Sequence, residues 1–286
     1  MDIGVIGCGN MGGGMVAQLL GAGFGVRCFD PDPATRLRMA DTGAQTTDTA
    51  TELASLCDVI ILSLPKAEIV TAVMNDIAPH IRQGAIVLDT STSVPATSQA
   101  MSALGEQHGF AFIDGPVSGG PAAAIAGTMT MLLGGDTDPI KRLAPVLDIL
   151  TAKTVIVGKS GAGHAAKIAN NMLCAANLVL VAEAVRLGEA AGVNAANLLD
   201  GINAGSGRSG VSEVNFPKWV LNDGFDSGFT MGLMRKDVGL ALALAKDTGV
   251  ALNGFENIAD IWLNQSPSIA DAADFNEIVK QGDTND

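Results

Sequence analysis

The chain has 286 residues, of which 48% are hydrophobic and 16% charged, and its formal net charge is −13. This composition supports a sizeable hydrophobic core, and the length allows two domains. The acidic balance argues against nucleic acid or an anionic membrane as a partner, because binding a polyanion needs a basic surface. Tyrosine is absent, so no tyrosine serves as a general acid or base.

The cysteines and the chain start point to an intracellular protein. The four cysteines show no CxxC pair and no histidine at ligand spacing, so we expect neither a disulfide framework nor a metal site. The chain begins directly with a strand-like run, without a basic segment or a cleavage site. The most apolar long stretch, 171–193, carries charged residues and is predicted as a buried helix rather than a membrane span. We therefore expect a cytoplasmic protein.

The first part of the chain alternates short β-rich runs with helical stretches. The first two runs flank a helical segment at 11–23 and form a βαβ unit of about thirty residues. Alternation of this kind predicts a Rossmann domain, with a largely parallel, doubly wound sheet covered by helices on both faces. The runs lie at 2–6, 25–29, 58–64, 85–90, 111–117, 128–135 and 153–158.

After Gly163 the pattern is helical and shows no convincing strand. One long helical pattern runs over 165–192 and stops near Gly188 and Gly192. We expect a Rossmann dinucleotide-binding domain over 1–160 and an all-helical domain over 161–286, joined by this long helix. The other helical stretches lie at 194–205, 213–223, 231–249 and 253–265.

The sequence Gly7-x-Gly9-x-x-Gly12 follows the first β-rich run and opens the helical segment, the context in which this pattern predicts dinucleotide binding. Gly7 permits the tight turn, Gly9 lets the backbone approach the pyrophosphate, and Gly12 lets helix and strand pack closely. The pyrophosphate would lie on amide donors at the positive end of the helix. The predicted cofactor set therefore includes Asn10 and Met11.

Asp30 closes the second β-rich run, where an acidic side chain accepts hydrogen bonds from the adenosine ribose. It would repel the extra phosphate of NADP, and no Arg or Lys follows immediately to bind that phosphate. The sequence therefore favours NAD over NADP. A turn residue before Pro31 is the alternative interpretation of Asp30. Leu64, which ends the run 58–64, and Pro65, which follows it, complete the predicted contacts in this part of the chain.

Three further stretches lie at strand ends or helix starts, and the first is DTSTSVP, residues 89–95. Asp89, Ser91 and Thr92 cluster at the carboxyl end of a predicted strand, where an open α/β sheet binds its ligands. Capping of a helix at 96–108 would explain these residues equally well.

The second stretch is DGPVSGGPAAAIAGT, residues 114–128. Ser118, Gly119 and Gly120 form a turn whose amides and hydroxyl suit a carboxylate, and the following helix start adds a favourable dipole. An ordinary glycine-rich loop is the alternative interpretation.

The third stretch is GAGHAAKIANN, residues 161–171, at the start of the long helix. Lys167 and Asn171 are four residues apart and so share one helical face. A lysine in an apolar cleft has its pKa lowered by desolvation and can exchange a proton with a substrate hydroxyl, which Asn171 could orient. A solvated lysine is the alternative. His164 is predicted to lie at the surface or behind the site.

Together these motifs identify a family. GVIGCGNMGGGM, LDTSTSVP, DGPVSGGPAAAIAGT, GAGHAAKIANN and the late MRKDVGLALALA occur in order and span nearly the whole chain. In these motifs the chain resembles the β-hydroxyacid dehydrogenase family, which includes 3-hydroxyisobutyrate dehydrogenase, tartronate semialdehyde reductase and the more distant 6-phosphogluconate dehydrogenases. The resemblance implies hydride transfer between NAD and the carbon that bears a β-hydroxyl group.

The resemblance also implies residue roles. Lys167 would be the catalytic acid/base, the Ser118–Gly120 turn would bind the substrate carboxylate, and Asn171 would assist at the substrate. Thr92 would contact the cofactor, and Lys236 would close over the nicotinamide end, next to both cofactor and substrate. A surface charge paired with Asp237 is the alternative interpretation of Lys236.

The substrate is less well defined by the sequence. The segment 203–217 is predicted to loop towards the active site, with Ser206, Arg208 and Ser209 near a second polar group of the substrate. Helix capping or a contact between domains is the alternative for Arg208. 3-Hydroxyisobutyrate leads a group of small acids that includes serine, threonate, sulfolactaldehyde and tartronate semialdehyde.

The same motifs count against rival functions. Lys167 counts against an imine reductase, and the full set of motifs counts against a non-catalytic NAD sensor. A 6-phosphogluconate site would need a cluster of Lys and Arg and a longer helical domain, and the sequence shows neither.

Apolar residues around 239–245 predict a homodimer or homotetramer.

Overall fold

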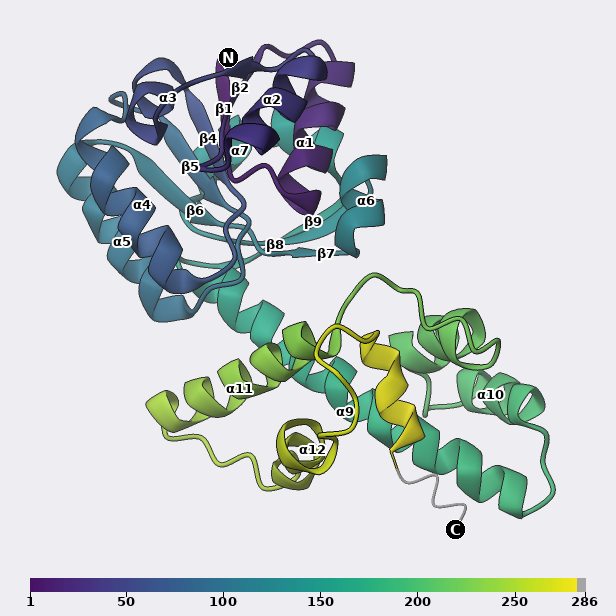
Figure 1. Ribbon diagram of the computed structural model, residues 1–286. Helices are drawn as coiled ribbons and strands as arrows, with labels where there is room; N and C mark the ends of the chain where they lie inside the picture. Colours follow the sequence, from purple (N-terminus) through teal and green to yellow (C-terminus); the bar gives the residue numbers. More distant parts are fainter. Residues whose placement is uncertain (282–286) are drawn as a thin grey trace. The chain divides into compact units, whose positions relative to one another are not determined.

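The computed structural model describes residues 1–281, and the chain divides into two compact units, Met1–Lys167 and Ile168–Asp286 (Figure 1). The first unit contains a nine-stranded sheet in the order β3-β2-β1-β4-β5-β6-β8-β7, with β9 beside β8. The strands from β3 to β6 are parallel, whereas β8 runs antiparallel to β6 and β7. The strands are β1 (Ile3–Ile6), β2 (Val26–Phe29), β3 (Gln45–Thr46), β4 (Val59–Leu62), β5 (Ile86–Asp89), β6 (Ala111–Asp114), β7 (Val117–Ser118), β8 (Met129–Gly134) and β9 (Thr151–Gly158).

Helices cover both faces of this sheet, as strands that are buried at successive positions require, because successive side chains point to opposite faces. Val5 and Ile61 belong to a core that includes Met15 of α1, whereas Ile60 belongs to the opposite core with Met74 of α4. Figure 1 shows α1 and α6 apart from α4 and α5, with the sheet between them. The helices are α1 (Asn10–Gly21), α2 (Pro33–Asp41), α3 (Ala50–Leu56), α4 (Ala67–Ile77), η1 (Ala78–His80), α5 (Pro95–His108), α6 (Gly120–Ala126), α7 (Thr137–Arg142) and α8 (Ala144–Leu150).

The strand order reverses at β1, and this position locates the ligand crevice. From β1 the chain builds β2 and β3 on one side, and it then returns to form β4 on the other side of β1. Open α/β sheets bind ligands outside the carboxyl ends of their strands at such a reversal. The turns at Gly7, after β1, and at Ser63, after β4, lie at this point, and Ser63 donates its N–H to the carbonyl of Ile6 over 2.9 Å.

The second unit is helical and is built along α9 (Ala162–Ala190), which starts within the first unit. Leu178 of α9 lies in a core with Phe216 and Trp262, and the Trp262 indole N–H donates to the carbonyl of Ala175 over 3.2 Å. The other elements are α10 (Ala195–Ala204), η2 (Val211–Val220), α11 (Met231–Thr248), α12 (Glu256–Asp260), η3 (Ile261–Gln265) and η4 (Phe275–Lys280).

The predicted fold class is confirmed, with local differences. Each β-rich run contains a strand, but the run 111–117 breaks at Gly115 and Pro116 into β6 and β7, and β3 and η4 were not predicted. The helix predicted over 213–223 starts earlier, at Val211, and ends at Val220, so the loop predicted over 203–217 is shorter than expected. The two units meet inside α9, between Lys167 and Ile168, so the boundary at 160 stays a prediction.

The long helix α9 is the one element within residues 1–281 with the length and apolar composition of a membrane span. Its most apolar window has a mean hydropathy of 1.5, and 44% of that window is buried inside the protein. The buried residues include Ala175, Leu178 and Val181, which line the core of the second unit. The predicted buried helix is therefore buried along one face only, because Leu173, Leu180 and Leu187 of the same helix are exposed.

Candidate active site

The Gly7–Gly12 loop has the close backbone packing that its glycines predict. Gly7 has φ = +89°, a conformation that L side chains rarely adopt, and a Cβ there would collide with the carbonyl of Ser63. A Cβ on Gly12 would collide with the carbonyl of Gly7. Any side chain at either position would therefore force the loop away from α1 or from the end of β4.

The loop also presents the donors that a pyrophosphate needs. Gly9 is the N-cap residue of α1 and has no side chain to cap the helix, so within residues 1–281 the first turn lacks the usual capping acceptor. A Cβ added to Gly9 would meet no protein atom within 4 Å. Open space in front of uncapped amides, at the positive end of a helix, fits a dinucleotide pyrophosphate. Asn10 and Met11 form the start of this turn.

Asp30 follows β2 and contacts the loop directly. Its Oδ2 accepts the Cys8 N–H over 2.8 Å, and its Oδ1 accepts the Asp32 N–H over 3.0 Å. The carboxylate therefore shapes both the loop and the turn before α2. The Arg36 guanidinium donates to the Asp30 carbonyl over 2.7 Å and lies 5.9 Å from the centre of the Phe29 ring. The Arg36 cation thus lies next to Asp30, although it is six residues further along the chain. The sequence prediction had looked for an Arg or Lys only among the residues that immediately follow Asp30.

Lys167 and Ser118 meet, although 49 positions separate them in the chain. The Lys167 ammonium donates to the Ser118 hydroxyl over 2.8 Å, and both side chains are half-buried. Ser118 ends β7, and Gly119 and Gly120 follow with φ of +119° and +65°. Such left-handed backbone is open to glycine, which explains the Gly-Gly pair. The contact favours a paired lysine over a solvated one.

Asn171 and Asp237 form a buried pair in the second unit. The Asn171 amide donates to Asp237 Oδ2 over 2.6 Å, and Asn170 donates to Asn171 Oδ1 over 3.0 Å. Lys236 lies 3.9 Å from Asp237 Oδ1, which is the ion pair that the alternative interpretation of Lys236 expected. Sequence reasoning gave Asp237 no role of its own.

A signal for Asp237 was present in the sequence. The buried face of α11 contains Met231, Met234, Asp237, Val238 and Ala241, which follow the spacing of an amphipathic helix. An acidic residue inside such a stripe must find a polar partner, because an unpaired buried carboxylate is costly.

Residues 89–92 do not cap the following helix. The N-cap residue of α5 is Val94, without a side-chain hydrogen bond, so the capping interpretation is wrong. Asp89 Oδ1 instead accepts the Ser91 N–H over 3.0 Å, and Ser91 Oγ accepts the Leu64 N–H over 2.9 Å. The bond between Leu64 and Ser91 thereby connects the turns after β4 and β5. Pro65 and the half-buried Thr92 are the next residues in the chain after these two.

Asp89 is fully buried, and within residues 1–281 its Oδ2 has no hydrogen-bond partner. Burial raises the pKa of the Asp89 carboxyl above its ordinary value, and this effect exceeds the opposing influence of His164. A raised pKa in the folded state means that the folded protein binds the proton more tightly than the unfolded chain does. Stability therefore falls as pH rises through the window between the two pKa values.

Asp89→Asn should accordingly gain in melting temperature over the wild type as pH rises from about 4 to about 8, because the amide keeps the acceptor for Ser91 and carries no buried charge. Thermal unfolding across this range tests it, with the exposed Asp148→Asn as a control that should show no such trend. A gap between Asp89→Asn and wild type that is independent of pH would contradict the expected burial effect.

His164 is buried, with 1% of its side chain exposed, so of its two predicted positions the surface is wrong and the place behind the site stays a prediction. Its Nδ1 lies 2.7 Å from the Ser98 hydroxyl, and its Nε2 lies 3.0 Å from the Ser91 carbonyl. Asp114, at the end of β6, accepts the N–H groups of Gly161 over 2.7 Å and of His164 over 3.1 Å. Burial raises the pKa of Asp114, and the Gly161 N–H opposes that rise.

Sequence reasoning did not assign Asp114 or Ser98 a role. The available signal was positional: Asp89 and Asp114 end neighbouring strands and are paired in register. The partners of Asp114 come from the start of α9, where His164 also contacts Ser98 of α5, and only the packing of these helices reveals them.

The segment at 206–209 does not form a defined site. Arg208 is 64% exposed and lies 3.7 Å from Glu213, and the Ser209 N–H donates to Ser212 Oγ over 2.9 Å. Ser206 is exposed. Within residues 1–281, no group of three or more His, Cys, Asp or Glu side chains is placed to hold a metal ion.

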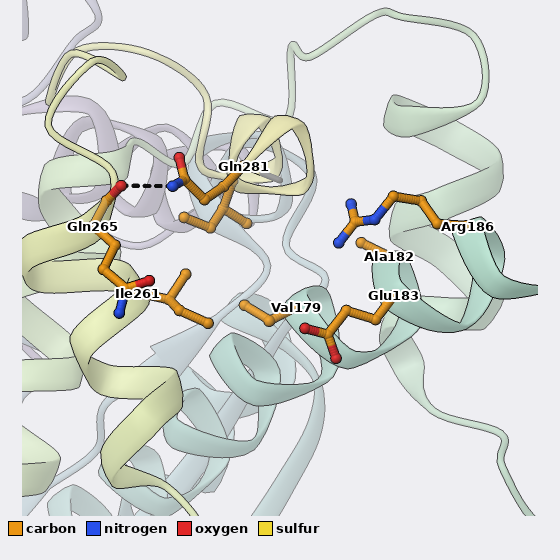
Figure 2. A pocket seen from close by; sticks show the side chains of 8 residues that line it. Val179, Ala182, Glu183, Arg186, Ile261, Gln265 and Gln281 are labelled. Atoms are coloured by element: carbon orange, nitrogen blue, oxygen red, sulfur yellow. Dashed lines mark hydrogen bonds between the residues drawn. The ribbon is translucent and has the colours of Figure 1, made fainter. Parts of the chain in front are cut away.

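A separate cavity of about 170 Å³ lies in the second unit, between α9, η3 and η4 (Figure 2). Val179 and Ile261 form part of its wall, while Glu183 and Arg186 contribute charge from α9. Gln281 donates to the Gln265 carbonyl over 2.6 Å at one side. None of the predicted site residues lines this cavity, so it is not the predicted active site.

Two family models match the chain along most of its length. One, described as the NAD binding domain of 6-phosphogluconate dehydrogenase, matches residues 2–158. The other, described as "NAD-binding of NADP-dependent 3-hydroxyisobutyrate dehydrogenase", matches residues 161–281. The chain therefore combines a nicotinamide dinucleotide-binding domain with the helical part of the same family.

Individual relatives agree with these models. The probable 3-hydroxyisobutyrate dehydrogenase of Mycobacterium tuberculosis is 35% identical over 283 residues, which cover 97% of this chain and 96% of that protein. The 2-(hydroxymethyl)glutarate dehydrogenase of Eubacterium barkeri is 36% identical over 255 residues, which cover 88% of this chain and 85% of that protein.

Solved structures extend the comparison. A structure of the M. tuberculosis 3-hydroxyisobutyrate dehydrogenase with L-serine aligns with a TM-score of 0.92 at 35% identity, and the alignment covers 98% of each chain. An imine reductase from Myxococcus stipitatus aligns with a TM-score of 0.62 at 17% identity over 98% of each chain, which shows a shared fold alone. The chain belongs to the β-hydroxyacid dehydrogenase family, whose members act on CH–OH groups with a nicotinamide cofactor.

Proposed function

We propose that this protein interconverts a short β-hydroxyacid and its semialdehyde or keto form, with NAD as the hydride acceptor. The observation that carries the proposal is the hydrogen bond between the Lys167 ammonium and the Ser118 hydroxyl, in the same unit as an uncapped dinucleotide-binding turn. Oxidation of a hydroxyacid needs a group that takes the hydroxyl proton, placed beside hydrogen-bond donors that hold the carboxylate.

The protein residues position the substrate and manage its proton. The Ser118–Gly120 turn would bind the carboxylate, and Lys167 would take the proton of the β-hydroxyl in oxidation and return it in reduction. The nicotinamide, when bound, accepts the hydride from the carbon that bears the hydroxyl. Asn171 and Lys236 would contact the substrate, Lys236 would also contact the nicotinamide end of the cofactor, and Thr92 would contact the cofactor.

The cofactor preference follows from Asp30. Its carboxylate can accept both ribose hydroxyls of NAD, whereas the 2′-phosphate of NADP would be repelled at this position. Asp30→Ala should raise KM for NAD by about tenfold and lower KM for NADP, because a charge-assisted hydrogen bond to the ribose is lost and the negative charge that repels the 2′-phosphate is removed. Initial rates with both cofactors test this expectation. An unchanged ratio of the two kcat/KM values would contradict it.

The substrate is proposed as 3-hydroxyisobutyrate, in keeping with the relatives that are 35% identical over nearly the whole chain. Serine, threonate and tartronate semialdehyde carry a carboxylate with a nearby oxygen function and form the alternative set, together with sulfolactaldehyde, which carries a sulfonate in place of the carboxylate. An imine is less favoured, because the chain has Lys167. Rates of NADH formation, or of NADH consumption for the aldehydes, over this panel test the proposal. A rate above background only with an imine would overturn it.

A homodimer or homotetramer is also proposed, and α9 supplies its support. Leu173, Leu180 and Leu187 recur at every seventh position and are 56%, 51% and 74% exposed. An apolar stripe of this kind on a soluble protein marks an interaction surface. The half-buried leucines at 239–245 pack against the core, so the apolar surface expected there is on α9 instead. A monomer at micromolar concentration in sedimentation would contradict the proposal, and Leu180→Glu should weaken the oligomer.

A further inference from the structure

We propose that His164 is a positioning residue that holds the cofactor-binding segment at Ser91 and Thr92 against the first turn of the helix that carries Lys167. The inference rests on the proposed function, which includes a nicotinamide cofactor, and it assigns one further residue to the support of the cofactor site. His164 itself would touch neither cofactor nor substrate. Its effect would pass through the Ser91 carbonyl.

The imidazole makes two hydrogen bonds in opposite directions. The Ser91 carbonyl can only accept, so His164 Nε2 must carry the hydrogen of their 3.0 Å contact. In the neutral ring Nδ1 then accepts from the Ser98 hydroxyl over 2.7 Å. With 1% of its side chain exposed, the ring is inaccessible to solvent, and both partners are buried as well. Removing the ring would therefore leave buried polar groups to find other partners.

The bond to Ser91 reaches the cofactor turns. Ser91 is held at three atoms: its N–H by Asp89, its Oγ by the Leu64 N–H and its carbonyl by His164. Leu64 and Thr92 are both predicted cofactor contacts, and each is adjacent to one of these bonds. A shift of the Ser91 carbonyl would therefore move two predicted contacts together.

The backbone of His164 fixes the other end of the connection. Its N–H donates to Asp114 Oδ2, and the Gly161 N–H donates to Asp114 Oδ1, which anchors the start of α9 to the end of β6. Lys167 follows three residues later in the same helix and bonds Ser118. His164 is thus the residue whose side chain contacts the cofactor turn while its backbone anchors the lysine-bearing helix.

Two amide variants separate the two ring nitrogens. The amide nitrogen of glutamine reaches the position of Nε2, whereas the shorter asparagine reaches only that of Nδ1. His164→Gln should therefore keep the bond to Ser91, and His164→Asn should lose it. Ser98→Ala is the matched control, because it removes the other bond of the same buried ring and leaves the Ser91 bond in place.

The readout is the Kd for NADH from fluorescence titration, which needs no hydroxyacid substrate. We expect His164→Asn to raise Kd about tenfold, and His164→Gln and Ser98→Ala to stay within about threefold of wild type. If His164→Asn and Ser98→Ala lost NADH affinity equally, in proportion to their losses in melting temperature, His164 would have only a structural role and the inference would be overturned. Unchanged binding by His164→Asn would overturn it as well.

A measurement on the unmodified protein keeps the inference testable if His164→Asn does not fold. The chain has three histidines, and nitrogen-15 NMR of the imidazoles distinguishes a ring protonated at Nε2 from one protonated at Nδ1. A resonance for His164 with the hydrogen on Nε2 is expected, and a hydrogen on Nδ1 alone would rule out the Ser91 bond. If the wild-type protein does not bind NADH, the proposed function itself fails. If the wild type binds NADH and His164→Asn binds it equally tightly, only the His164 inference fails.

Discussion

Lys167→Ala should lower kcat by about 10³-fold, the range that a positioned general acid/base contributes, with the Kd for NADH within about twofold of wild type. The reason for this split lies in the contacts of the lysine. Its ammonium bonds the Ser118 hydroxyl, which lies outside the Gly7–Gly12 loop, so its loss removes the base while the predicted pyrophosphate turn keeps its own residues. Steady-state rates and an NADH titration on the same preparation measure both quantities.

Lys159→Ala is the control for this prediction, because Lys159 is exposed in the segment just before α9. It should leave both kcat and the Kd for NADH unchanged. If Lys167→Ala kept a tenth or more of the wild-type turnover, the lysine would not be the acid/base. A loss of NADH binding as large as the loss of turnover would instead point to a damaged fold.

Gly9→Ala should raise the Kd for NADH by at least about tenfold while the melting temperature stays within a few degrees of wild type. A methyl group at this position meets no protein atom within 4 Å, so the protein itself has room for it. The space belongs to the approach of the pyrophosphate to the backbone. A binding loss without a stability loss would therefore locate the ligand rather than a packing defect.

Two further glycines of the same region make this test specific. Gly21→Ala adds a methyl group to the last turn of α1, also with no protein atom within 4 Å, and should leave NADH binding unchanged. Gly12→Ala places a methyl group against the carbonyl of Gly7 and should lower both stability and NADH binding. If Gly9→Ala bound NADH as tightly as Gly21→Ala does, the predicted pyrophosphate position would be wrong.

The sequence was sufficient for the fold because its signals are local. Seven β-rich runs alternate with helical stretches, and each run contains a strand. The glycine loop, the acidic residue after β2 and the Lys167 turn are likewise short motifs whose neighbours in sequence determine their shape. Even the break after β6 occurs where Gly115 and Pro116 interrupt the run 111–117.

The interior polar network around Asp89, Ser91, Asp114 and His164 was not accessible in the same way. Its members come from β5, β6, α5 and α9, so their meeting depends on helix packing and not on periodicity. For this reason the sequence left two positions open for His164, at the surface or behind the site: one polar residue near a helix start resembles a surface residue until its two buried partners are known. Asp237 was similarly taken as the partner of its neighbour rather than of Asn171.

The central claim is hydride transfer from the hydroxyl-bearing carbon of a small acid. Its most direct test incubates the purified protein with NAD and short β-hydroxyacids that carry deuterium on that carbon, followed by mass spectrometry of the reduced cofactor. We predict that the reduced cofactor retains the deuterium, with a strongly reduced yield from Lys167→Ala. Unlabelled NADH, or no reduced cofactor from any acid in the panel, would contradict the proposed reaction.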